Sequence, residues 1–283
     1  MDDPIATAPG SDTLRPQGST RVSTLERFLF HLAVLITFLV LVPHAFAKTI
    51  RVMTYNIHVG IGMDKKLDLQ RIAGVINKEK PDLVGLQEVD RGVQRTQRID
   101  EIVELAKLTR MEYAFAFNLP YQGGQYGVAI LSRFPIRATE HRLYKNLRQA
   151  ERRGFIRAEV KLGGRVVHFV TTHLDYQHDD GRLFEAQQML AFLSDVKGPL
   201  IVVGDFNDTP AGETFTLMRS LFDEAWAIRP SDEGFSYPAD KPVKRIDYIF
   251  TRRTDGIKTK RAWVVKTLAS DHIPVVADLE IGR

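Results

Sequence analysis

Short runs of apolar or alternating residues, separated by turn-forming residues, recur along the chain after residue 48. Runs of about four to eight such residues are typical of buried strands. Gly163-Gly164 falls between two of these runs and is typical of a tight hairpin turn. The predicted strands are Ile50–Ile57, Leu83–Gln87, Tyr126–Ser132, Phe155–Leu162, Arg165–Leu174, Leu200–Gly204, Arg245–Phe250 and Pro274–Ile281.

Three segments instead show the 3.6-residue period of an amphipathic helix: Leu69–Asn77, Arg98–Leu108 and Gly181–Val196. Asp68 is placed to cap the first of them, and Pro81 is placed to end it. Many strands interleaved with a few helices, without an internal repeat or a low-complexity linker after Lys48, predict one α/β sandwich domain.

The first 47 residues have a different pattern. Arg21 and Arg27 precede an apolar run, Phe28–Val42, which is followed by the small-x-small sequence at 45–47. This is the layout of a secretory signal, and the run is shorter than the roughly 20 apolar residues that a spanning helix requires. The prediction for 1–47 is a cleaved signal, with an uncleaved membrane anchor and a peripheral helix as alternatives.

The predicted protein is therefore exported, either periplasmic or secreted, or anchored to the membrane by residues 28–47. The domain, 48–283, contains 236 residues and is expected to be monomeric, with membrane contact only through the N-terminal segment. The absence of cysteine excludes a disulfide framework, a thiolate zinc site and a cysteine nucleophile. The net charge of +4 fits anionic partners without identifying nucleic acid or membrane.

Carboxylate, amide and imidazole side chains stand at the ends of these strands. Each has an ordinary explanation alone, as a turn residue, a solvent-exposed carboxylate or a hydrogen-bonded histidine. Strand ends on one side of a sheet converge, so together they predict a single cleft. Oxygen donors with imidazoles and no thiol suit a hard divalent cation such as Mg²⁺. The residues are Asn56, Glu88, His173, Asp205, Asn207, Asp247, Asp271 and His272.

Four ordered blocks carry a family resemblance. The most specific are Gly204-Asp205-Phe206-Asn207 and Ser270-Asp271-His272-Ile273-Pro274-Val275, supported by Leu86-Gln87-Glu88-Val89 and Arg245-Ile246-Asp247-Tyr248. From about Thr49 to Leu279 the chain resembles the endonuclease/exonuclease/phosphatase, or DNase I-like, superfamily. The resemblance implies an α/β (α+β) four-layer sandwich, in which two mixed β-sheets pack face to face with helices outside. It also implies Mg²⁺-dependent hydrolysis of phosphoesters, with Mn²⁺ as a substitute cation.

The resemblance further implies roles for the metal-binding and water-binding residues. Glu88 resembles the principal Mg²⁺ ligand, with Asn56 beside it, and Asp271 resembles an outer-sphere or second-metal carboxylate. Asp205 and Asn207 resemble the pair that orients the nucleophilic water and holds a phosphate oxygen.

The two histidines are also assigned by the resemblance. His272, oriented by Asp247, resembles the imidazole that binds the scissile phosphate or takes the proton of the water. His173 resembles a second histidine that stabilises the phosphorane or protonates the leaving oxygen. Some relatives give this second histidine an acidic partner, whereas this chain has Gln125 and Tyr126 at that place. Arg152, with the neighbouring Arg148 and Arg153, is predicted to hold an anionic substrate. Tyr126 is predicted to offer its hydroxyl to the substrate, with an ordinary core aromatic as the alternative.

The leading hypothesis is a Mg²⁺-dependent phosphodiesterase or nuclease whose substrate is exported or close to a membrane. The alternative is a phospholipid head-group hydrolase of the sphingomyelinase or inositol-phosphatase kind. A non-catalytic binding module on the same fold is a third reading, but it would be expected to have lost catalytic groups that are present here. The basic run at 252–261 is predicted to be a solvated loop rather than a steering surface for phosphate backbones.

Overall fold

A computed structural model describes residues 48–229 and 233–282. The predicted signal or anchor at 1–47 lies outside the described residues, so its cleavage and the exported location stay predictions. Within the described ranges, none of the helices combines the length and the apolar character needed to cross a membrane.

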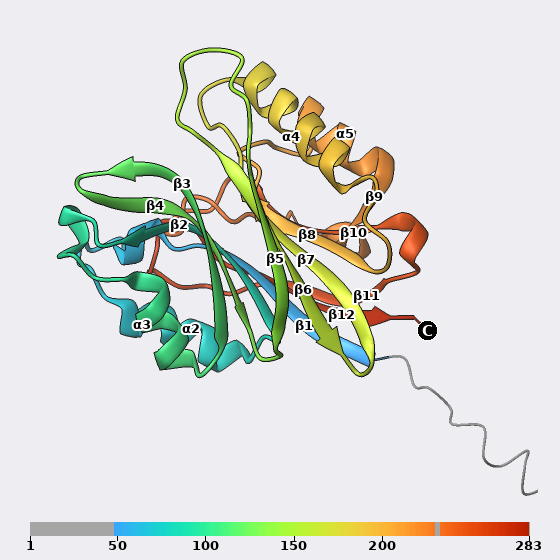
Figure 1. Ribbon diagram of the computed structural model, residues 1–283, viewed down its shortest axis with the longest axis horizontal. Helices are drawn as coiled ribbons and strands as arrows, with labels where there is room; N and C mark the ends of the chain where they lie inside the picture. The colour runs from blue at the N-terminus through green and yellow to red at the C-terminus, as the bar shows by residue number, and fades with distance from the viewer. Residues whose placement is uncertain (1–47, 230–232, 283) are drawn as a thin grey trace, which may run out of the picture. The chain divides into compact units, whose positions relative to one another are not determined.

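The first sheet is built around a parallel pair, β1 (Lys48–Asn56) and β2 (Leu83–Arg91), joined by helix α2 (Leu69–Glu79). Its strand order is β11-β12-β1-β2-β4-β3, and all other neighbours in it are antiparallel (Figure 1). Because α2 returns the chain to the starting edge, the carboxyl ends of β1 and β2 lie at one edge of the sheet. The other strands are β3 (Glu112–Tyr121), β4 (Gly124–Ser132), β11 (Lys258–Val264) and β12 (Val275–Ile281).

The second sheet repeats this arrangement. Its central parallel pair is β7 (Arg165–His173) and β8 (Leu200–Asp205), joined by helix α4 (Asp179–Leu193), and its order is β5-β6-β7-β8-β10-β9. The remaining neighbours are again antiparallel. The other strands are β5 (Ile136–Leu143), β6 (Gly154–Leu162), β9 (Phe222–Glu224) and β10 (Asp247–Arg252).

Three apolar cores hold four layers together. One core, with Val52 and Phe169 among its members, fills the space between the two sheets. A second joins the first sheet to α2 and α3 (Glu101–Thr109), and a third joins the second sheet to α4 and α5 (Glu213–Leu221) (Figure 1). The sheets approach closely at Gly85, where a Cβ atom would lie 2.4 Å from Val203 Cγ2.

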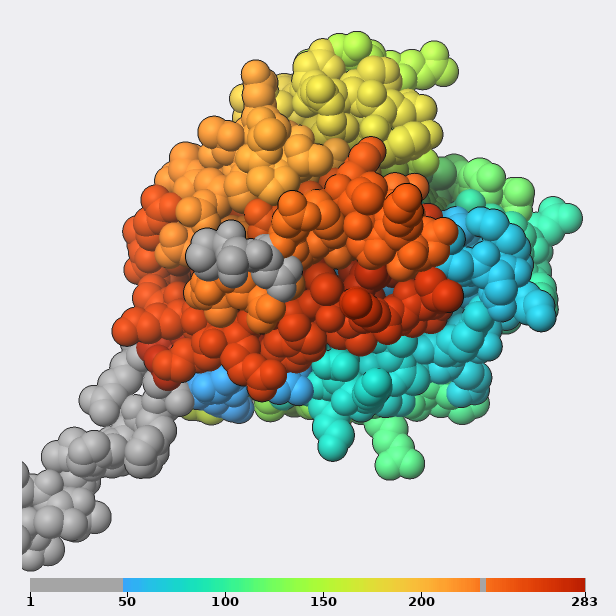
Figure 2. Space-filling view, turned by 180° about the vertical axis from the view of Figure 1, so that it is seen from behind, coloured from blue at the N-terminus to red at the C-terminus, as the bar shows by residue number. Residues whose placement is uncertain are grey.

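The C-terminal part of the chain completes the sandwich. Seen from behind, the orange and red residues lie across the middle of the surface, between the cyan N-terminal elements and the yellow α4 (Figure 2). The segment contributes strands to both sheets, β10 to the second and β11 and β12 to the first. It therefore carries Asp247 and His272 to the place where both sheets end.

The predicted fold class is confirmed, and so are all eight predicted strands and the three predicted helices, with small changes at their ends. Asp68 caps α2 by accepting a hydrogen bond from the Arg71 amide. Leu162 pairs with Arg165, so Gly163-Gly164 is a two-residue hairpin turn.

Five elements were not predicted, namely β3, β5, β9, β11 and α5. The prediction of a solvated loop at 252–261 is wrong for its second half, because Lys258–Val264 is β11 and pairs with β12. Its basic side chains are largely exposed along the outer edge of the sheet. Charged side chains on an edge strand protect its unpaired backbone from other strands, and they also hide the strand from a search for apolar runs.

Candidate active site

Strand register brings three predicted site residues to one level of the second sheet. β7 runs parallel to β8 and pairs His173 with Asp205, while β10 runs antiparallel to β8 and pairs Asp247 with Asp205. In the first sheet Asn56 is the last residue of β1, and Glu88 lies near the end of β2. Both parallel pairs therefore direct polar side chains into one cleft between the sheet ends.

A β-bulge directs Glu88 into this cleft. The pairing of β2 with β4 shifts between Leu86 and Val89, and Glu88 has a φ of +55°, a conformation that non-glycine residues rarely adopt. Gln87 instead lies buried between the sheets and donates from Nε2 to Thr171 Oγ1 at 2.8 Å. Strain of this kind costs on the order of 1–3 kcal/mol and is concentrated at functional sites.

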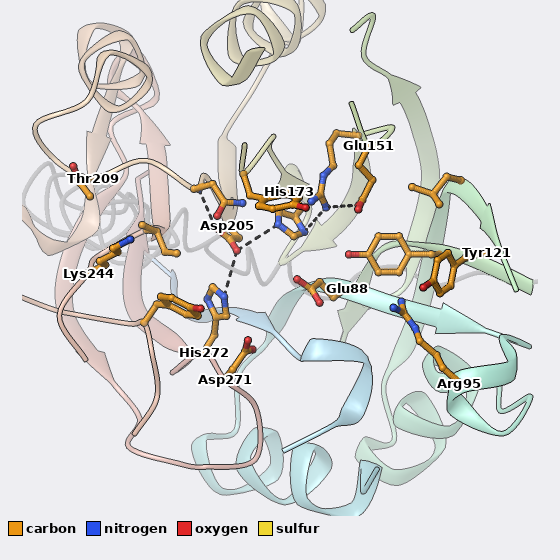
Figure 3. A pocket seen from close by; sticks show the side chains of 17 residues that line it. Glu88, Arg95, Tyr121, Glu151, His173, Asp205, Thr209, Lys244, Asp271 and His272 are labelled. Carbon is orange, nitrogen blue, oxygen red and sulfur yellow. Dashed lines mark hydrogen bonds and ion pairs between the residues drawn. The ribbon is translucent and has the colours of Figure 1, made fainter. Parts of the chain in front are cut away.

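The cleft has a volume of about 520 Å³. Arg95 and Tyr121 lie at one end of it, Lys244 and Thr209 lie at the other, and carboxylates and histidines occupy the middle (Figure 3). Its carboxylates are Glu88, Glu151, Asp205 and Asp271. Its cationic side chains are Arg95, Arg153 and Lys244, and its tyrosines are Tyr121, Tyr126, Tyr176 and Tyr237.

Asn56 links the carboxylates of the two sheets. Its Nδ2 donates to Glu88 Oε1 at 3.1 Å and to Asp205 Oδ2 at 3.0 Å. Its Oδ1 accepts from the His58 amide at 3.0 Å. Asn56 is 1% exposed, so its amide holds two acidic groups in position and relieves part of their mutual repulsion. In this arrangement the residue positions the predicted metal ligand Glu88 and does not present its own oxygen to the cleft.

Asp205 is the buried carboxylate at the centre of the site. Its Oδ1 accepts from the Asn207 amide at 2.9 Å, and Asn207 Nδ2 donates to Leu174 O at 3.0 Å. Asn207 has a φ of +50°, which turns the chain sharply after β8. Burial, together with the nearby charge of Asp247, raises the pKa of Asp205 to about 7, against the opposing effect of His272.

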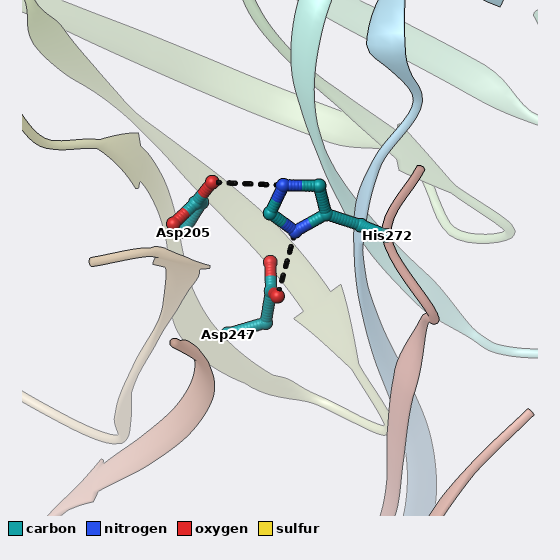
Figure 4. Close-up of side chains that lie close together, drawn as sticks. All are labelled: Asp205, Asp247 and His272. Carbon is teal, nitrogen blue, oxygen red and sulfur yellow. Dashed lines mark hydrogen bonds and ion pairs between the residues drawn. The ribbon is translucent and has the colours of Figure 1, made fainter. Parts of the chain in front are cut away.

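His272 forms a hydrogen-bonded pair with Asp247 (Figure 4). Its Nδ1 lies 2.9 Å from Asp247 Oδ2, which also accepts from Ser236 Oγ at 2.6 Å, and its Nε2 lies 3.6 Å from Asp205 Oδ2. Burial alone would lower the pKa of His272. The charges of Asp247 and Asp205 and the hydrogen bond to Asp247 outweigh burial and raise the pKa to about 10. The imidazole is therefore a cation at neutral pH.

His173 has a different partner. Its Nδ1 lies 2.8 Å from Arg153 Nη1, and its Nε2 lies 3.5 Å from Asp205 Oδ2. A guanidinium only donates hydrogen bonds, so Nδ1 must accept and the proton must reside on Nε2. Burial, followed by the charges of Arg153 and His272, lowers the pKa of His173 well below its usual value. His173 is thus a neutral hydrogen-bond donor that faces the cleft.

The donor set fits a hard divalent cation. Glu88 and Asp271 both line the open part of the cleft with carboxylate oxygens, the ligands that Mg²⁺ prefers. Ligand atoms of Asp205, Asp247 and His272 also lie within 4.8 Å of one another. However, His272 Nδ1 and Asp247 Oδ2 are already joined by a hydrogen bond of 2.9 Å, which a metal ion would have to break. The oxygen-lined side at Glu88 and Asp271 is the better cation site, because Glu88 Oε2 and Asp271 Oδ2 accept no hydrogen bond from the described residues.

The two side chains predicted to bind substrate, Tyr126 and Arg152, lie in different surroundings. Tyr126 lines the cleft, whereas Arg152 is exposed and is not among the residues that line it. Arg153 takes that place, because successive side chains of an extended segment point to opposite sides. Of the three arginines that the sequence offered before Gly154, Arg153 is the one that lines the cleft. Arg95, Tyr121, Tyr176, Tyr237 and Lys244 were not predicted, since each lies in a loop, a short turn or the edge strand β3.

Comparison with known proteins defines the class. The endonuclease/exonuclease/phosphatase family model matches residues 53–272, most of the chain, and the chain belongs to this family. Members of the family are hydrolases that act on phosphoesters. The predicted family is therefore confirmed.

Individual relatives agree with this assignment. The chain is 26% identical over 246 residues to the uncharacterized protein YbhP of Escherichia coli K12, covering 82% of this chain and 96% of that protein. The mannosyl-6-phosphatase Bt3783 of Bacteroides thetaiotaomicron superposes with a TM-score of 0.68 at 16% identity, covering 81% and 99% of the two chains. The human Nocturnin catalytic domain, solved with bound sulfate, gives 0.65 at 20% identity, covering 83% and 94%. These two likenesses show the fold.

Proposed function

We propose that this protein is a Mg²⁺-dependent phosphodiesterase, and that the substrate bridges the cleft with its scissile phosphate beside Asp205. The observation that carries the proposal is the convergence of Glu88, Asp205, His173 and His272 on one cleft. A phosphodiester resists attack because an anion must approach an anion. The site places a cation and a neutral donor where that charge accumulates, together with oxygen ligands for a metal.

Each residue has a definite part in this reaction. Glu88 and Asp271 would hold the metal ion, which supplies Lewis-acid stabilisation of a phosphoryl oxygen when bound. His272, kept cationic by its two carboxylate neighbours, binds a phosphoryl oxygen from one side. His173 donates the Nε2 proton in a hydrogen bond from the other side. Asp205, whose pKa is raised to about 7, orients the attacking water and accepts its proton. The bond between phosphorus and the leaving oxygen breaks as the new bond forms, and the leaving oxygen takes a proton from solvent.

The shape of the cleft favours a diester over a monoester. Arg95 and Tyr121 extend it on one side of the central carboxylates, and Lys244 and Thr209 extend it on the other (Figure 3). A monoester would leave one of these ends empty, whereas a diester carries a group on each side of its phosphorus. The predicted exported location is consistent with a nucleic-acid or lipid-derived diester outside the cytoplasm.

A phospholipid head-group hydrolase is the second candidate. The observation in its favour is that Tyr121 and Tyr176 line the cleft while being 39% and 56% exposed. Partly exposed tyrosines at the mouth of a site can rest at a membrane–water interface. An uncleaved N-terminal anchor would strengthen this reading, because it would keep the cleft close to a bilayer.

The test is turnover by the purified protein of bis-p-nitrophenyl phosphate, p-nitrophenyl phosphate, RNA, plasmid DNA, sphingomyelin and phosphoinositide. Each substrate is offered with Mg²⁺, with Mn²⁺ and with chelator. Chelation is expected to abolish activity, and Glu88→Gln to lower kcat at least about 100-fold, since the metal would lose a principal ligand. Glu104→Gln, on the exposed face of α3, is the matched control. Turnover that survives chelation, or that is confined to the monoester, contradicts the proposal.

A further inference from the structure

The end of the cleft at Arg95 is built around a buried ion pair. Arg95 belongs to the short 3-10 helix Gln94–Thr96 after β2. Its Nε and Nη2 donate to the two oxygens of Asp90 at 2.8 and 3.0 Å, and the Asp90 side chain is 0% exposed. Thr96 Oγ1 also donates to Asp90, at 3.2 Å. The pair fixes the guanidinium plane at the wall of the cleft.

Two tyrosine rings lie next to this guanidinium. Its central carbon lies 4.4 Å from the ring centre of Tyr121 and 5.3 Å from that of Tyr126. A guanidinium has five N–H groups, of which Asp90 takes two. Nη1 makes no hydrogen bond to the described part of the chain, although the side chain is 32% exposed and lines the cleft. The N–H groups of Arg95 that Asp90 does not use lie in the plane of the guanidinium. In this plane a phosphate or a carboxylate can accept two parallel hydrogen bonds.

This end is continuous with the centre of the site. Tyr126 stands directly across from Asp90 in the β2–β4 pairing. Tyr126 and Arg153 both line the cleft, and Arg153 in turn contacts His173. Glu151 also lines the cleft, and its Oε1 forms an ion pair with Arg153 Nη1 at 3.1 Å. An anionic group can therefore approach Arg95 without facing an unpaired carboxylate at that point of the wall.

We infer that Arg95 and Tyr121 form a subsite for a second phosphate of the substrate, on the Glu88 side of the scissile phosphate. The inference rests on the proposed function and narrows it to esters that carry a further phosphate next to the reacting one. The free edge of Arg95 binds the phosphate oxygens, and the exposed ring of Tyr121 supports the group that joins the two phosphates. A polynucleotide and a phosphorylated inositol both offer this chemistry.

A second arginine provides a matched control. Arg91 also pairs with an aspartate, Asp100, at 2.7 Å, and its guanidinium lies 5.0 Å from the ring centre of Phe115. Arg91 and Asp100 are both about one-third exposed and do not line the cleft. An arginine–aspartate pair that does not line the cleft is thus present close by in the chain. The two pairs differ in what they face and in burial, because Asp90 is fully buried and Asp100 is about one-third exposed.

The experiment measures binding by calorimetry, which does not require turnover. Thymidine 3′,5′-bisphosphate is compared with thymidine 5′-phosphate, and inositol 1,4-bisphosphate with inositol 1-phosphate, each in the presence of Mg²⁺. The wild type is expected to bind at least one bisphosphate tenfold or more tightly than its monophosphate. The pair that shows the preference identifies the nucleotide or the inositol source. Arg95→Gln is expected to reduce the preference about 10- to 100-fold, the effect of losing a hydrogen bond between charged groups.

The Arg95→Gln variant leaves the buried Asp90 carboxylate without its partner and can therefore fail to fold. In that case the Asp90→Asn/Arg95→Gln double variant, which replaces both charged side chains with neutral amides, is used instead. Arg91→Gln should retain the wild-type preference. Equal binding of bisphosphates and monophosphates by the wild type, or an undiminished preference in the double variant, would overturn the subsite. Failure of the proposed function is seen separately, as absence of metal-dependent turnover of bis-p-nitrophenyl phosphate.

Discussion

His272 and His173 approach the same oxygen atom from neighbouring strands and loops, yet they are held in opposite ways. Their Nε2 atoms lie 3.6 and 3.5 Å from Asp205 Oδ2. Behind His272 stands the carboxylate of Asp247, whereas behind His173 stands the guanidinium of Arg153. Both imidazoles are at least 95% buried, so the difference between them comes from the partner and not from exposure to water.

The partner decides where the proton is. A carboxylate at Nδ1 favours the imidazolium, and the pKa of His272 is raised to about 10. A guanidinium at Nδ1 excludes a proton from that nitrogen, and the pKa of His173 is lowered well below its usual range. One site therefore contains a cation and a neutral donor. Of the two roles predicted for His173, this arrangement favours stabilising the phosphorane over protonating the leaving oxygen.

The largest effect is expected from removing the cationic member. His272→Asn should lower kcat by about 10²- to 10⁴-fold, because it removes both the charge beside the phosphate and the group that restrains Asp205. His173→Asn retains an N–H donor and should cost about 10-fold. Steady-state kinetics on a chromogenic diester with Mg²⁺ measures both. Equal losses in the two variants would show that the histidines act alike.

A smaller effect is expected from Arg153. Arg153→Gln should reduce kcat/KM about tenfold, because His173 is then free to adopt the other tautomer and a buried cation is lost from the cleft. Arg157 provides the control, since its Nη1 also lies 2.8 Å from a histidine Nδ1, that of His168, outside the cleft. Arg157→Gln should leave kcat/KM within about twofold. If the two arginine variants behave alike, the pairing at His173 serves only the fold.

The sequence allowed prediction of the middle of each sheet but not of its borders. The eight predicted strands are the eight interior ones, and the four that were missed, β3, β5, β9 and β11, are the outermost strands of the two sheets. Interior strands are covered on both sides and appear as apolar runs. Edge strands face water and have mixed or charged sequences, such as Ile136–Leu143.

The same division applies to the site. Asn56, His173 and Asp205 terminate interior strands and Glu88 follows the apolar run of another, so a polar residue after an apolar run revealed them. The residues that were missed lie elsewhere: Tyr121 is on an edge strand, and Arg95 and Lys244 lie in a short turn and a loop, where a polar residue is common. The partner of His173 was beyond prediction for a second reason. The neighbours of a buried imidazole depend on three-dimensional packing, and the run of three charged residues before Gly154 does not reveal which side chain turns inward.

The smallest expected effect concerns the stability of the folded protein. It distinguishes the protonation states of His272 and His173 without any substrate. The pKa of His272 is about 10 in the folded protein against 6.5 ordinarily, so the folded state holds its proton more tightly than the unfolded state. That contribution is complete below pH 6.5 and is lost as the pH rises towards 10. The free energy of unfolding of the metal-free protein should fall over this interval by on the order of 1–4 kcal/mol from this group.

Denaturant unfolding at several pH values, in chelator, measures this slope, and nitrogen chemical shifts of the imidazoles report the two protonation states directly. At pH 8, His272 should appear as an imidazolium and His173 as a neutral ring with its proton on Nε2. Asp247→Asn removes the carboxylate that favours the cation, so the pKa of His272 should fall and the slope between pH 6.5 and 10 should flatten. A slope that persists unchanged in Asp247→Asn would mean that Asp205 alone keeps His272 charged. The contrast between the two histidines would then arise from Arg153 behind His173 and not from Asp247 behind His272.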